Sequence, residues 1–461
     1  MKYFPHTDGD IKEMLESVGV DSVDSLFSDI PPDKLIDRLN LPAPLSEMEV
    51  VNALNALSVR NRPAYDRPGF LGAGIYRHFT PSVVDAVLSR SEFYTSYTPY
   101  QAEASQGTLQ TIFEYQTLIS MLTGMDFSNA SVYDGATACA EAVSMAMAQT
   151  RRSEILISAG VHPEYIETIR TYYRHTQGVV IRELPLADGV TDVSKLSSAI
   201  TKATAGVIIQ SPNCLGFIEP AEEIGKMIRE ADKKTAYIMA VTEPHSLGVL
   251  KNPGGLGADI AVGEAGGLGL PPSFGGPHVG FMAARNAYLR KMPGRLVGQT
   301  TDSEGRQAFC LTLQAREQHI RREKAASNIC TNQALCALGV TVYLSHLGRE
   351  GFRDLARLNM DRAHYLRDCL MKIPGFTMAG GQPFFNEFTM KCPDDPMKVD
   401  LYLKKQGITG GFITGRWGRE EWNDYMTFCV TEMNSRRDMD ELAGHLKNFC
   451  REEAGTACTT A

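Results

Sequence analysis

Short apolar runs alternate with helical patterns through the middle of this chain, and this alternation limits the possible folds more than any other feature. The apolar runs lie at residues 155–157, 179–181, 207–210, 237–241 and 259–262, with stretches of helical periodicity between them. A strand that is buried on both faces reads as a continuous apolar run, and parallel strands need a crossover connection. The pattern therefore predicts an α/β fold with a mostly parallel sheet and helices on both faces.

The two ends of the chain differ from this middle part. Near the N-terminus, proline-rich breakers separate amphipathic stretches at 11–18, where Asp10 is the expected helix cap, at 34–39 and at 48–57. After residue 330, two long helical patterns at 332–347 and 352–371 precede shorter strands and helices. We expect an N-terminal helical arm over 1–65, a large α/β domain over 66–330, a smaller C-terminal α+β domain over 331–450 and a flexible polar tail over 451–461.

Composition and charge exclude several classes of protein. The chain has 461 residues, with 46 Lys and Arg against 54 Asp and Glu, which gives a net charge of −8. Such a balance lacks the basic surface that neutralises nucleic-acid phosphates. No run approaches the ~20 apolar residues of a membrane span, and the first residues resemble neither a signal nor a transit peptide. We therefore expect a cytoplasmic protein that binds neither nucleic acid nor membrane.

The common nucleotide, nucleophile and metal motifs are missing from the sequence. The glycine clusters at 254–257 and 266–269 lack G-x-G-x-x-G spacing, and neither a P-loop nor G-x-S-x-G occurs. The ten cysteines form no Cys-x-x-Cys pair, and the ten histidines no His-Glu-x-x-His motif. We therefore expect no metal site. We interpret the following histidines as packed or hydrogen-bonded: His78, His162, His245 and His278.

Several long motifs carry a resemblance to a known family. They are Tyr97-Thr98-Pro99-Tyr100-Gln101, Ser105-Gln106-Gly107, the stretch from Met292-Pro293-Gly294-Arg295 to Arg321-Arg322-Glu323-Lys324, Ser327-Asn328-Ile329-Cys330-Thr331, and Phe70-Leu71-Gly72-Ala73-Gly74. With these motifs the sequence resembles the glycine decarboxylase P-protein family over essentially the whole chain. Its length is similar to that of the separate α chain (subunit 1, the N-terminal half) of the two-gene bacterial form.

The resemblance implies a fold, a reaction and partners. The fold is the pyridoxal-phosphate-dependent transferase fold type I, and the assembly is an α2β2 heterotetramer with a β subunit. The activity is that of glycine dehydrogenase (aminomethyl-transferring, decarboxylating) in the glycine cleavage system. There glycine, bound to pyridoxal phosphate, loses CO2, and its aminomethyl group passes to the lipoyl group of the H-protein. The cofactor supplies the electron sink for this decarboxylation.

The distribution of lysines indicates that this chain is only part of such an enzyme. A Schiff-base lysine is needed after the last strands of the large domain, yet residues 252–290 contain none, and Lys251 and Lys291 only flank that window. Glu243 follows the apolar run 237–241 and is the acid available to pair with a pyridine nitrogen, although a lone carboxylate at a strand end is more often structural. We expect no catalytic residue in this chain, pyridoxal phosphate held covalently by the β subunit, and no activity of the isolated chain.

The motif at residues 97–101 has two interpretations. A cluster of Tyr, Thr and Pro residues commonly packs as an ordinary loop. In fold-type-I dimers, however, an N-terminal loop of one chain reaches the cofactor of the other. Hydroxyl and amide groups suit an anionic phosphate or a glycine carboxylate. The candidate contributors to the partner's active site in this motif are Tyr97, Thr98, Tyr100 and Gln101.

Three further residues are candidate contributors to that site. Thr300 lies in Gly298-Gln299-Thr300-Thr301, which is either a turn or a segment that reaches across the interface. Arg316 and Arg321 belong to a basic stretch that ends at Lys324. Such a stretch is either a solvated, salt-bridged face or, as the family resemblance suggests, a charged wall at the subunit junction.

Two other functions remain open from the sequence alone. The chain can be a scaffold that stabilises the β subunit and docks the lipoyl carrier, with no side chain in the active site. It can also be a complete pyridoxal-phosphate lyase that uses a lysine outside residues 252–290.

Overall fold

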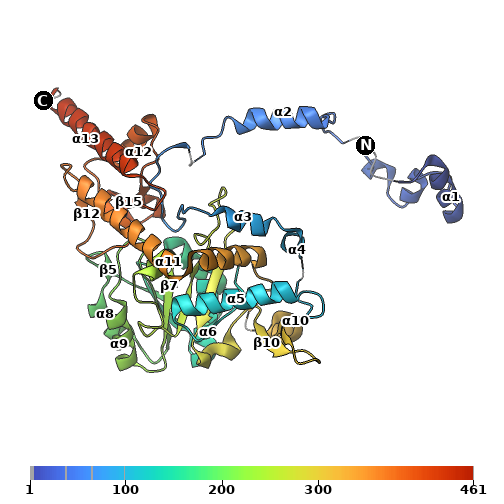
Figure 1. Ribbon diagram of the computed structural model, residues 1–461, viewed down its shortest axis with the longest axis horizontal. Coiled ribbons are helices and arrows are strands. Elements are labelled where there is room, and N and C mark those ends of the chain that lie inside the picture. The colour runs from blue at the N-terminus through green and yellow to red at the C-terminus, as the bar shows by residue number, and fades with distance from the viewer. Residues whose placement is uncertain (1–4, 37–38, 64–65, 98, 326, 460–461) are drawn as a thin grey trace. The chain divides into compact units, whose positions relative to one another are not determined.

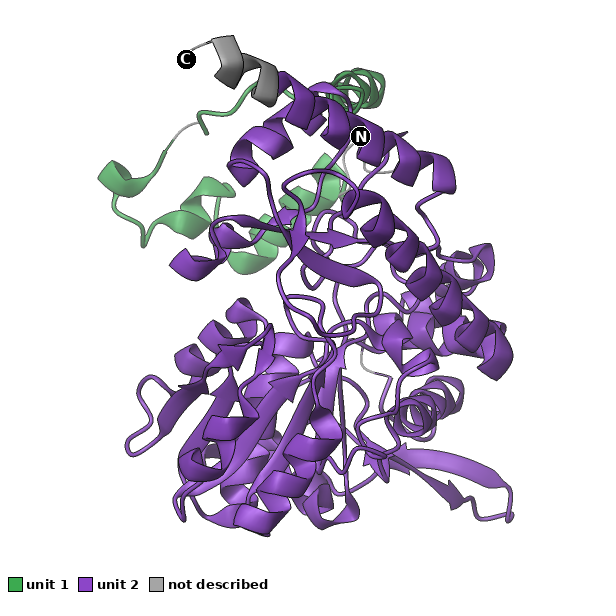
Figure 2. Ribbon diagram, turned by 90° about the vertical axis from the view of Figure 1, so that its left-hand side faces the viewer, with its two compact units in different colours: residues 1–63 green, residues 64–461 purple. Residues whose placement is uncertain are grey.

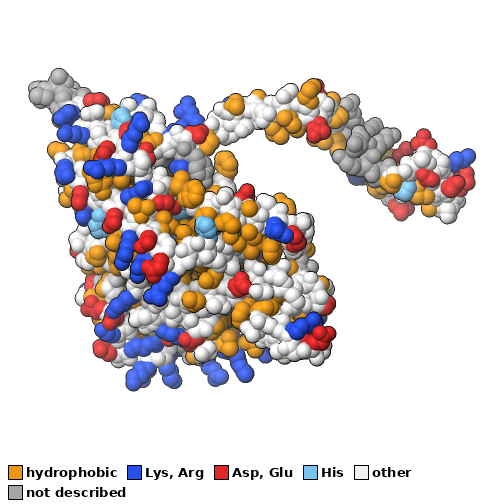
Figure 3. All heavy atoms as spheres, viewed as in Figure 1, with side chains coloured by type: hydrophobic (Ala, Val, Ile, Leu, Met, Phe, Trp, Pro, Cys, Tyr) orange, Lys and Arg blue, Asp and Glu red, His pale blue; other side chains and the backbone are white. Residues whose placement is uncertain are grey.

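The computed structural model describes residues 5–36, 39–63, 66–97, 99–325 and 327–459. The chain divides into two compact units, residues 1–63 and residues 64–461, which Figure 2 colours separately. Among the described residues, no helix is both long and apolar enough to cross a membrane. On the face shown in Figure 3, acidic and basic side chains are interspersed over most of unit 2.

Unit 1 consists of short helices. They are α1 (Asp8–Val18), the 3-10 turns Asp24–Phe27 and Pro32–Lys34, and α2 (Glu47–Ser58). The cap of α1 is Thr7 rather than Asp10, because the Thr7 hydroxyl accepts the Asp10 N–H while the Asp10 carboxylate accepts the Thr7 N–H. The helical stretch expected at 34–39 is wrong for Leu35 and Ile36, which are not helical, and residues 37–38 lie outside the described residues.

Figure 1 labels many of the helices of unit 2. The unit is built on a seven-stranded sheet in the order β1-β9-β8-β7-β6-β2-β3. Its strands are β1 (Phe127–Ser128), β2 (Glu154–Ser158), β3 (Val180–Leu184), β6 (Thr204–Gln210), β7 (Ala236–Val241), β8 (Ile260–Glu264) and β9 (Gly280–Ala284). Strands β3, β2, β6, β7 and β8 pair in parallel, whereas β9 is antiparallel to both of its neighbours, β8 and β1. This confirms the mostly parallel sheet predicted from the apolar runs.

Helices cover both faces of the sheet, as predicted. On strand β6, Ile208 packs into a core with α6 and α7, while Val207 and Ile209 pack on the opposite side with α5, α8, α9 and α11. This alternation follows from the two-residue repeat of a strand. The helices are α5 (Gln106–Thr123), α6 (Gly135–Thr150), α7 (Pro163–Tyr173), α8 (Val193–Ala199), α9 (Ala221–Ala231) and α11 (Ala334–Leu370).

A second, antiparallel sheet forms the other core of unit 2, in the order β12-β13-β15-β14. Helix α11 joins the two cores: its first half packs on the large sheet, and its residues from Ala363 onward pack with the small sheet. The two helical patterns expected here meet at Gly348, where the backbone has a φ of 61°. The remaining elements are β12 (Thr377–Met378), β13 (Glu387–Lys391), α12 (Pro396–Lys405), β14 (Phe412–Ile413), β15 (Tyr425–Cys429) and α13 (Arg436–Thr459).

Helix α13 continues through most of the segment that the sequence suggested would be a frayed tail. Residues 451–459 are thus helical, and the flexibility of the tail stays a prediction.

Shorter elements complete unit 2. They are α3 (Ser82–Leu88), α4 (Ser91–Tyr94), the pair β4 (Leu186–Ala187) and β5 (Val190–Thr191), the 3-10 helices Pro244–Gly248 and Asn286–Lys291, the hairpin of β10 (Val297–Thr301) and β11 (Gln307–Leu311), and α10 (Gln318–Arg321). Segment 69–79 lies beside the small sheet, where Phe70 exchanges backbone hydrogen bonds with Thr409 and Cys429.

Close packing at strand β8 generates a stability prediction. A Cβ atom at Gly263 would overlap the carbonyl oxygen of Val241 and lie 2.7 Å from the Phe281 ring. We expect Gly263→Ala to lower the free energy of unfolding by about 1–3 kcal/mol, because a central strand cannot move away from its neighbours. Urea unfolding followed by circular dichroism measures this.

Gly107 on α5 is the matched control, since a Cβ there meets no atom within 4 Å. Gly107→Ala should leave stability unchanged or raise it by up to about 1 kcal/mol. Equal effects of the two substitutions would contradict this account of the sheet.

Candidate functional site

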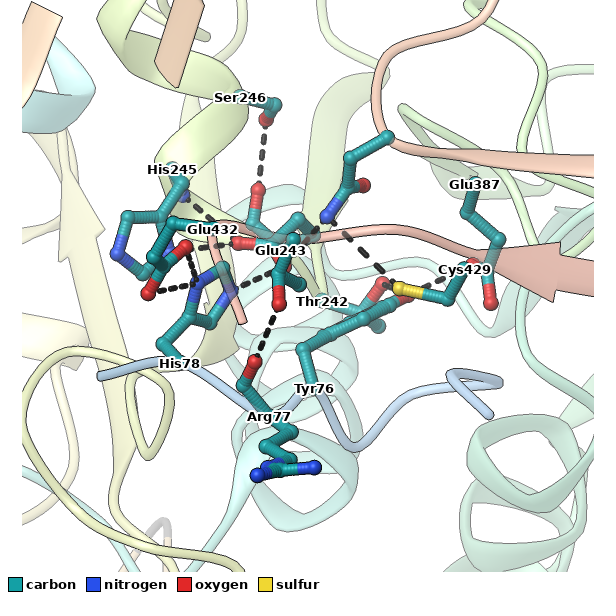
Figure 4. Close-up of polar contacts among 12 residues, drawn as sticks. Tyr76, Arg77, His78, Thr242, Glu243, His245, Ser246, Glu387, Cys429 and Glu432 are labelled. Carbon is teal, nitrogen blue, oxygen red and sulfur yellow. Dashed lines mark hydrogen bonds and ion pairs between the residues drawn. The ribbon is translucent and has the colours of Figure 1, made fainter. Parts of the chain in front are cut away.

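A buried ionic network occupies the carboxyl edge of the large sheet, where α/β proteins commonly bind ligands. His78 lies between two carboxylates in Figure 4. Its Nε2 is 2.9 Å from Glu243 Oε2, and its Nδ1 is 3.0 Å from Glu432 Oε2. Glu243 follows strand β7, Glu432 follows β15, and His78 comes from segment 69–79. The network therefore joins the large sheet, the small sheet and the segment beside them.

His245 extends the network from the other side of Glu243. Its Nδ1 is 2.9 Å from Glu243 Oε1, its Nε2 is 2.9 Å from the Tyr343 hydroxyl, and its ring stacks on His78 at 3.8 Å. Asn386 donates a further hydrogen bond to Glu243. Each oxygen of this carboxylate thus has a partner, as a buried charge requires.

The charges in the network follow from these contacts. Burial opposes protonation of His78, but the Glu243 charge and the two carboxylate hydrogen bonds raise the His78 pKa to about 10. Although burial opposes ionisation of the two acids, the histidines lower the pKa of Glu243 and bring that of Glu432 to about 2. Burial and the neighbouring His78 charge lower the pKa of His245. At neutral pH, an imidazolium therefore lies between two carboxylates, and His245 is neutral.

The same three side chains have the composition of a metal site. The ligand atoms of His78, Glu243 and His245 lie within 4.8 Å of one another. However, both ring nitrogens that face Glu243 are at hydrogen-bond distance from its oxygens, and His78 makes a second bond to Glu432. A doubly hydrogen-bonded imidazolium has no lone pair for a metal. We therefore interpret the group as an ion network.

A third buried carboxyl lies next to the network. Glu387, on β13, accepts hydrogen bonds from the Ala73 N–H at 2.6 Å and the Tyr76 hydroxyl at 2.9 Å. Burial raises the pKa of Glu387 to about 7, more strongly than these bonds lower it. Glu387 thus ties segment 69–79 to the small sheet.

A fourth carboxylate, Glu264, ends strand β8 beside the N-terminus of α6. It accepts backbone N–H bonds from Gly135 at 3.1 Å, Gly266 at 2.8 Å and Val279 at 3.0 Å. Asp134, the N-cap of α6, accepts the Thr137 N–H at 2.6 Å. Next to Glu264 is a cavity of about 20 Å³, enough for about one water molecule. Two side-chain carboxylates therefore take donors that could otherwise bind an external anion.

Among the described residues, no lysine takes part in the His78 network or in the contacts of Glu264. Residues 252–290 contain none. Lys251 is exposed and pairs with Glu222 at 2.7 Å. Among the residues that the structure describes, no lysine side chain is buried.

The predicted contributors at residues 97–101 have different environments. Tyr97 is 93% exposed, Gln101 is exposed, and Thr98 lies outside the described residues. The Tyr100 hydroxyl is 2.7 Å from Asn332 Oδ1, and the Arg295 guanidinium lies 3.8 Å from the Tyr100 ring centroid. Tyr100 therefore uses its polar group and its ring within the chain.

The other three predicted contributors lie on nearby segments. Thr300 is exposed on β10, and Arg321 is exposed on α10. Arg316 donates hydrogen bonds to the carbonyls of Met292 and Gly294, two residues of the segment that leads into β10. The hairpin itself packs with Tyr100 in one small apolar cluster. The structure thus gathers Tyr100, the hairpin and Arg316, and none of them joins the His78 network.

Sequence reasoning missed the pairing of His78 and the roles of Glu432 and Glu264. His78 and Glu243 are 165 residues apart, and His78 and Glu432 are 354 residues apart. No local spacing marks such pairs. Glu264 gave one signal, its position where an apolar run ends before a glycine cluster.

Comparisons with known proteins agree with this architecture. A crystal structure of glycine decarboxylase (P-protein) of the glycine cleavage system, in inhibitor-bound form, superimposes with a TM-score of 0.88 at 43% identity, covering 97% of this chain and 100% of that one. The sphingosine-1-phosphate lyase of Burkholderia pseudomallei matches with a TM-score of 0.64 at 14% identity, over 93% of this chain and 97% of that one. These neighbours confirm the predicted pyridoxal-phosphate-dependent fold type I.

The sequence comparisons cover nearly the whole chain. The probable glycine dehydrogenase (decarboxylating) subunit 1 of Desulforamulus reducens is 48% identical over 447 residues, which are 97% of this chain and 99% of that protein. The model of the glycine cleavage system P-protein family matches residues 1–446. The chain therefore belongs to the glycine cleavage system P-protein family.

Proposed function

We propose that this chain is the α-type subunit of a glycine dehydrogenase (decarboxylating), and that a second subunit holds the pyridoxal phosphate. The observation that carries the proposal is the near full-length similarity to a protein named subunit 1. The complete enzyme would then decarboxylate glycine and pass the aminomethyl group to the lipoyl group of an H-protein, as an α2β2 assembly in the cytoplasm.

Three features of this chain support placing the cofactor on the partner. The carboxyl edge of the large sheet has no lysine for a Schiff base. Glu264 and Asp134 take backbone donors at the N-terminus of α6, where a phosphate would otherwise bind. The cavity there is only about 20 Å³. The residues present do not fit pyridoxal phosphate, and we derive no chemical step in this chain.

The contribution of this chain to the partner's active site is part of the proposal. The candidates for direct contact with the partner's site are Tyr97, Thr98, Gln101, Thr300 and Arg321. All of them except Thr98 are among the described residues, and these four are exposed, so that a partner subunit can contact them. Tyr100 and Arg316 would act differently. Their hydrogen bonds hold the backbone of the surrounding segments in place, so we assign them a positioning role.

A scaffold without side chains in the active site is the second candidate. It is favoured by one observation, that Tyr100 and Arg316 direct their polar groups into their own chain. The substitutions at Tyr97 and Tyr100 described below separate the two possibilities.

The isolated chain should be inactive and colourless. Without a Schiff-base lysine it should neither absorb in the visible range after incubation with pyridoxal phosphate nor catalyse exchange of the glycine carboxyl group with bicarbonate. Mixing with the family's subunit 2 should restore exchange. Exchange by this chain alone at a rate near that of the mixture, or a visible band bleached by borohydride, would instead favour a self-sufficient lyase.

Tyr97→Phe should lower turnover of the mixed subunits by roughly ten- to a hundredfold, because a hydrogen bond to a charged group is worth about 1.5–3 kcal/mol. Tyr100→Phe should reduce activity less and also lower the melting temperature, since it removes the bond to Asn332. Tyr172→Phe, at an exposed tyrosine on α7, is the control. Turnover within twofold for both Tyr97→Phe and Tyr100→Phe would favour the scaffold.

His78 has a structural role in this proposal, and its charge makes that role dependent on pH. The raised pKa means that the stabilisation by His78 is complete below about pH 6.5 and is lost as pH rises to about 10. His78→Gln should therefore cost about 3–5 kcal/mol at pH 7, as expected when a buried ion pair loses one partner, and much less near pH 10.

Urea unfolding of the wild type and His78→Gln across this range measures the difference. His175→Gln, at an exposed histidine, should have little effect at any pH. A difference for His78→Gln that stays constant from pH 7 to pH 10 would show that His78 is not charged in the folded chain.

A further inference from the structure

The Glu264 carboxylate receives hydrogen bonds from three separate segments of unit 2. Gly135 N–H comes from the first turn of α6, Gly266 N–H from the turn after β8, and Val279 N–H from the residue before β9. His278 Nδ1 lies 3.9 Å from the same carboxylate. Three converging backbone donors beside an imidazole are the donor set of an anion site.

The carboxylate is enclosed beside the N-terminus of a helix. Helix α6 has 16 residues, and its N-terminus carries partial positive charge. Gly135 brings its N–H close to Glu264, and a Cβ at Gly135 would overlap the Tyr165 hydroxyl and lie 2.9 Å from the Gly263 carbonyl carbon. Glu264 itself is only 7% exposed. Burial raises the pKa of Glu264, whereas the three backbone N–H groups and His278 favour the ionised carboxylate and oppose that shift. The carboxylate is thus enclosed, and both of its oxygens accept backbone hydrogen bonds.

We propose that Glu264 is a built-in anion, which takes the place that a small external oxyanion would occupy in the cradle formed by Gly135, Gly266 and Val279. The cradle would become an oxyanion-binding site when this side chain is removed. The inference deepens the proposed function, because Glu264 is one of the features that support placing the cofactor on the partner. Its test uses this chain alone, so its failure is distinguishable from inactivity of the mixed subunits.

Volume decides which anion the opened cradle would accept. Glu264→Ala removes a CH2–COO⁻ group, whose shape acetate reproduces, and the neighbouring cavity adds about 20 Å³. Acetate should therefore bind the variant in place of the lost carboxylate. The wild type should bind neither acetate nor inorganic phosphate there, because its own carboxylate occupies the donors.

Thermal unfolding of the full chain, with acetate compared against chloride at equal ionic strength and pH 7.5, tests the proposal. The melting temperature of Glu264→Ala should fall below that of the wild type in chloride. It should rise by about 1–2 °C when acetate is tenfold above its dissociation constant. The melting temperature of the wild type should be the same in acetate, in chloride and in phosphate.

Glu387→Ala is the matched control, since it also removes a buried carboxyl group but lies on a strand and accepts one backbone N–H, from Ala73. It should show little or no gain specific to acetate. The proposal would be overturned if acetate raised the melting temperature of both variants equally. It would also be overturned if acetate gave Glu264→Ala no gain in stability, whether or not that variant folds in chloride.

Glu264→Gln provides a second test that keeps the shape of the side chain. Its amide group places N–H donors against the donors of the cradle, so its melting temperature should fall by several degrees, and acetate should not restore it because the space remains filled. A melting temperature within 1 °C of the wild type would show that the cradle does not require an anion.

Discussion

The imidazolium of His78 lies between the carboxylates of Glu243 and Glu432, and three segments far apart in the sequence meet there. Removing water from these charges is costly, and only their mutual contacts compensate for it. Each partner therefore fixes the position of the others. The end of β7, the loop after β15 and segment 69–79 are held in one arrangement, and both sheets of unit 2 depend on it.

The fold was more accessible from the sequence than the site. Apolar runs such as 207–210 report burial on both faces, and burial is a property of the strand itself, so the parallel sheet was predictable. The absence of lysine from 252–290 was equally visible. The pairing of His78 with Glu432 was not visible in the sequence, because a contact across 354 residues depends on how the two sheets pack. Glu264 was visible as a residue, but its donors come from three segments that only the folded sheet brings together.

Carboxylates dominate the carboxyl edge of the large sheet, where α/β proteins commonly bind ligands. Glu243 is used by two histidines, and Glu264 by three backbone N–H groups. Both acids are satisfied within the chain, and neither is left with a free face toward a ligand. Internal compensation of charge thus gives stability at this edge, while the exposed groups near Tyr97 and Thr300 remain available to a partner.

The break in α11 at Gly348 has a mechanical consequence. The helix packs on the large sheet before this residue and, through Phe352, just after it, and it packs on the small sheet near its end. Residues 349–370 form an arm of about 33 Å at 1.5 Å per residue, so a turn of only ~5° at Gly348 would displace the far end by about 3 Å. The backbone angles of this one residue therefore set the direction in which the second part of the helix runs from the large-sheet core to the small-sheet core.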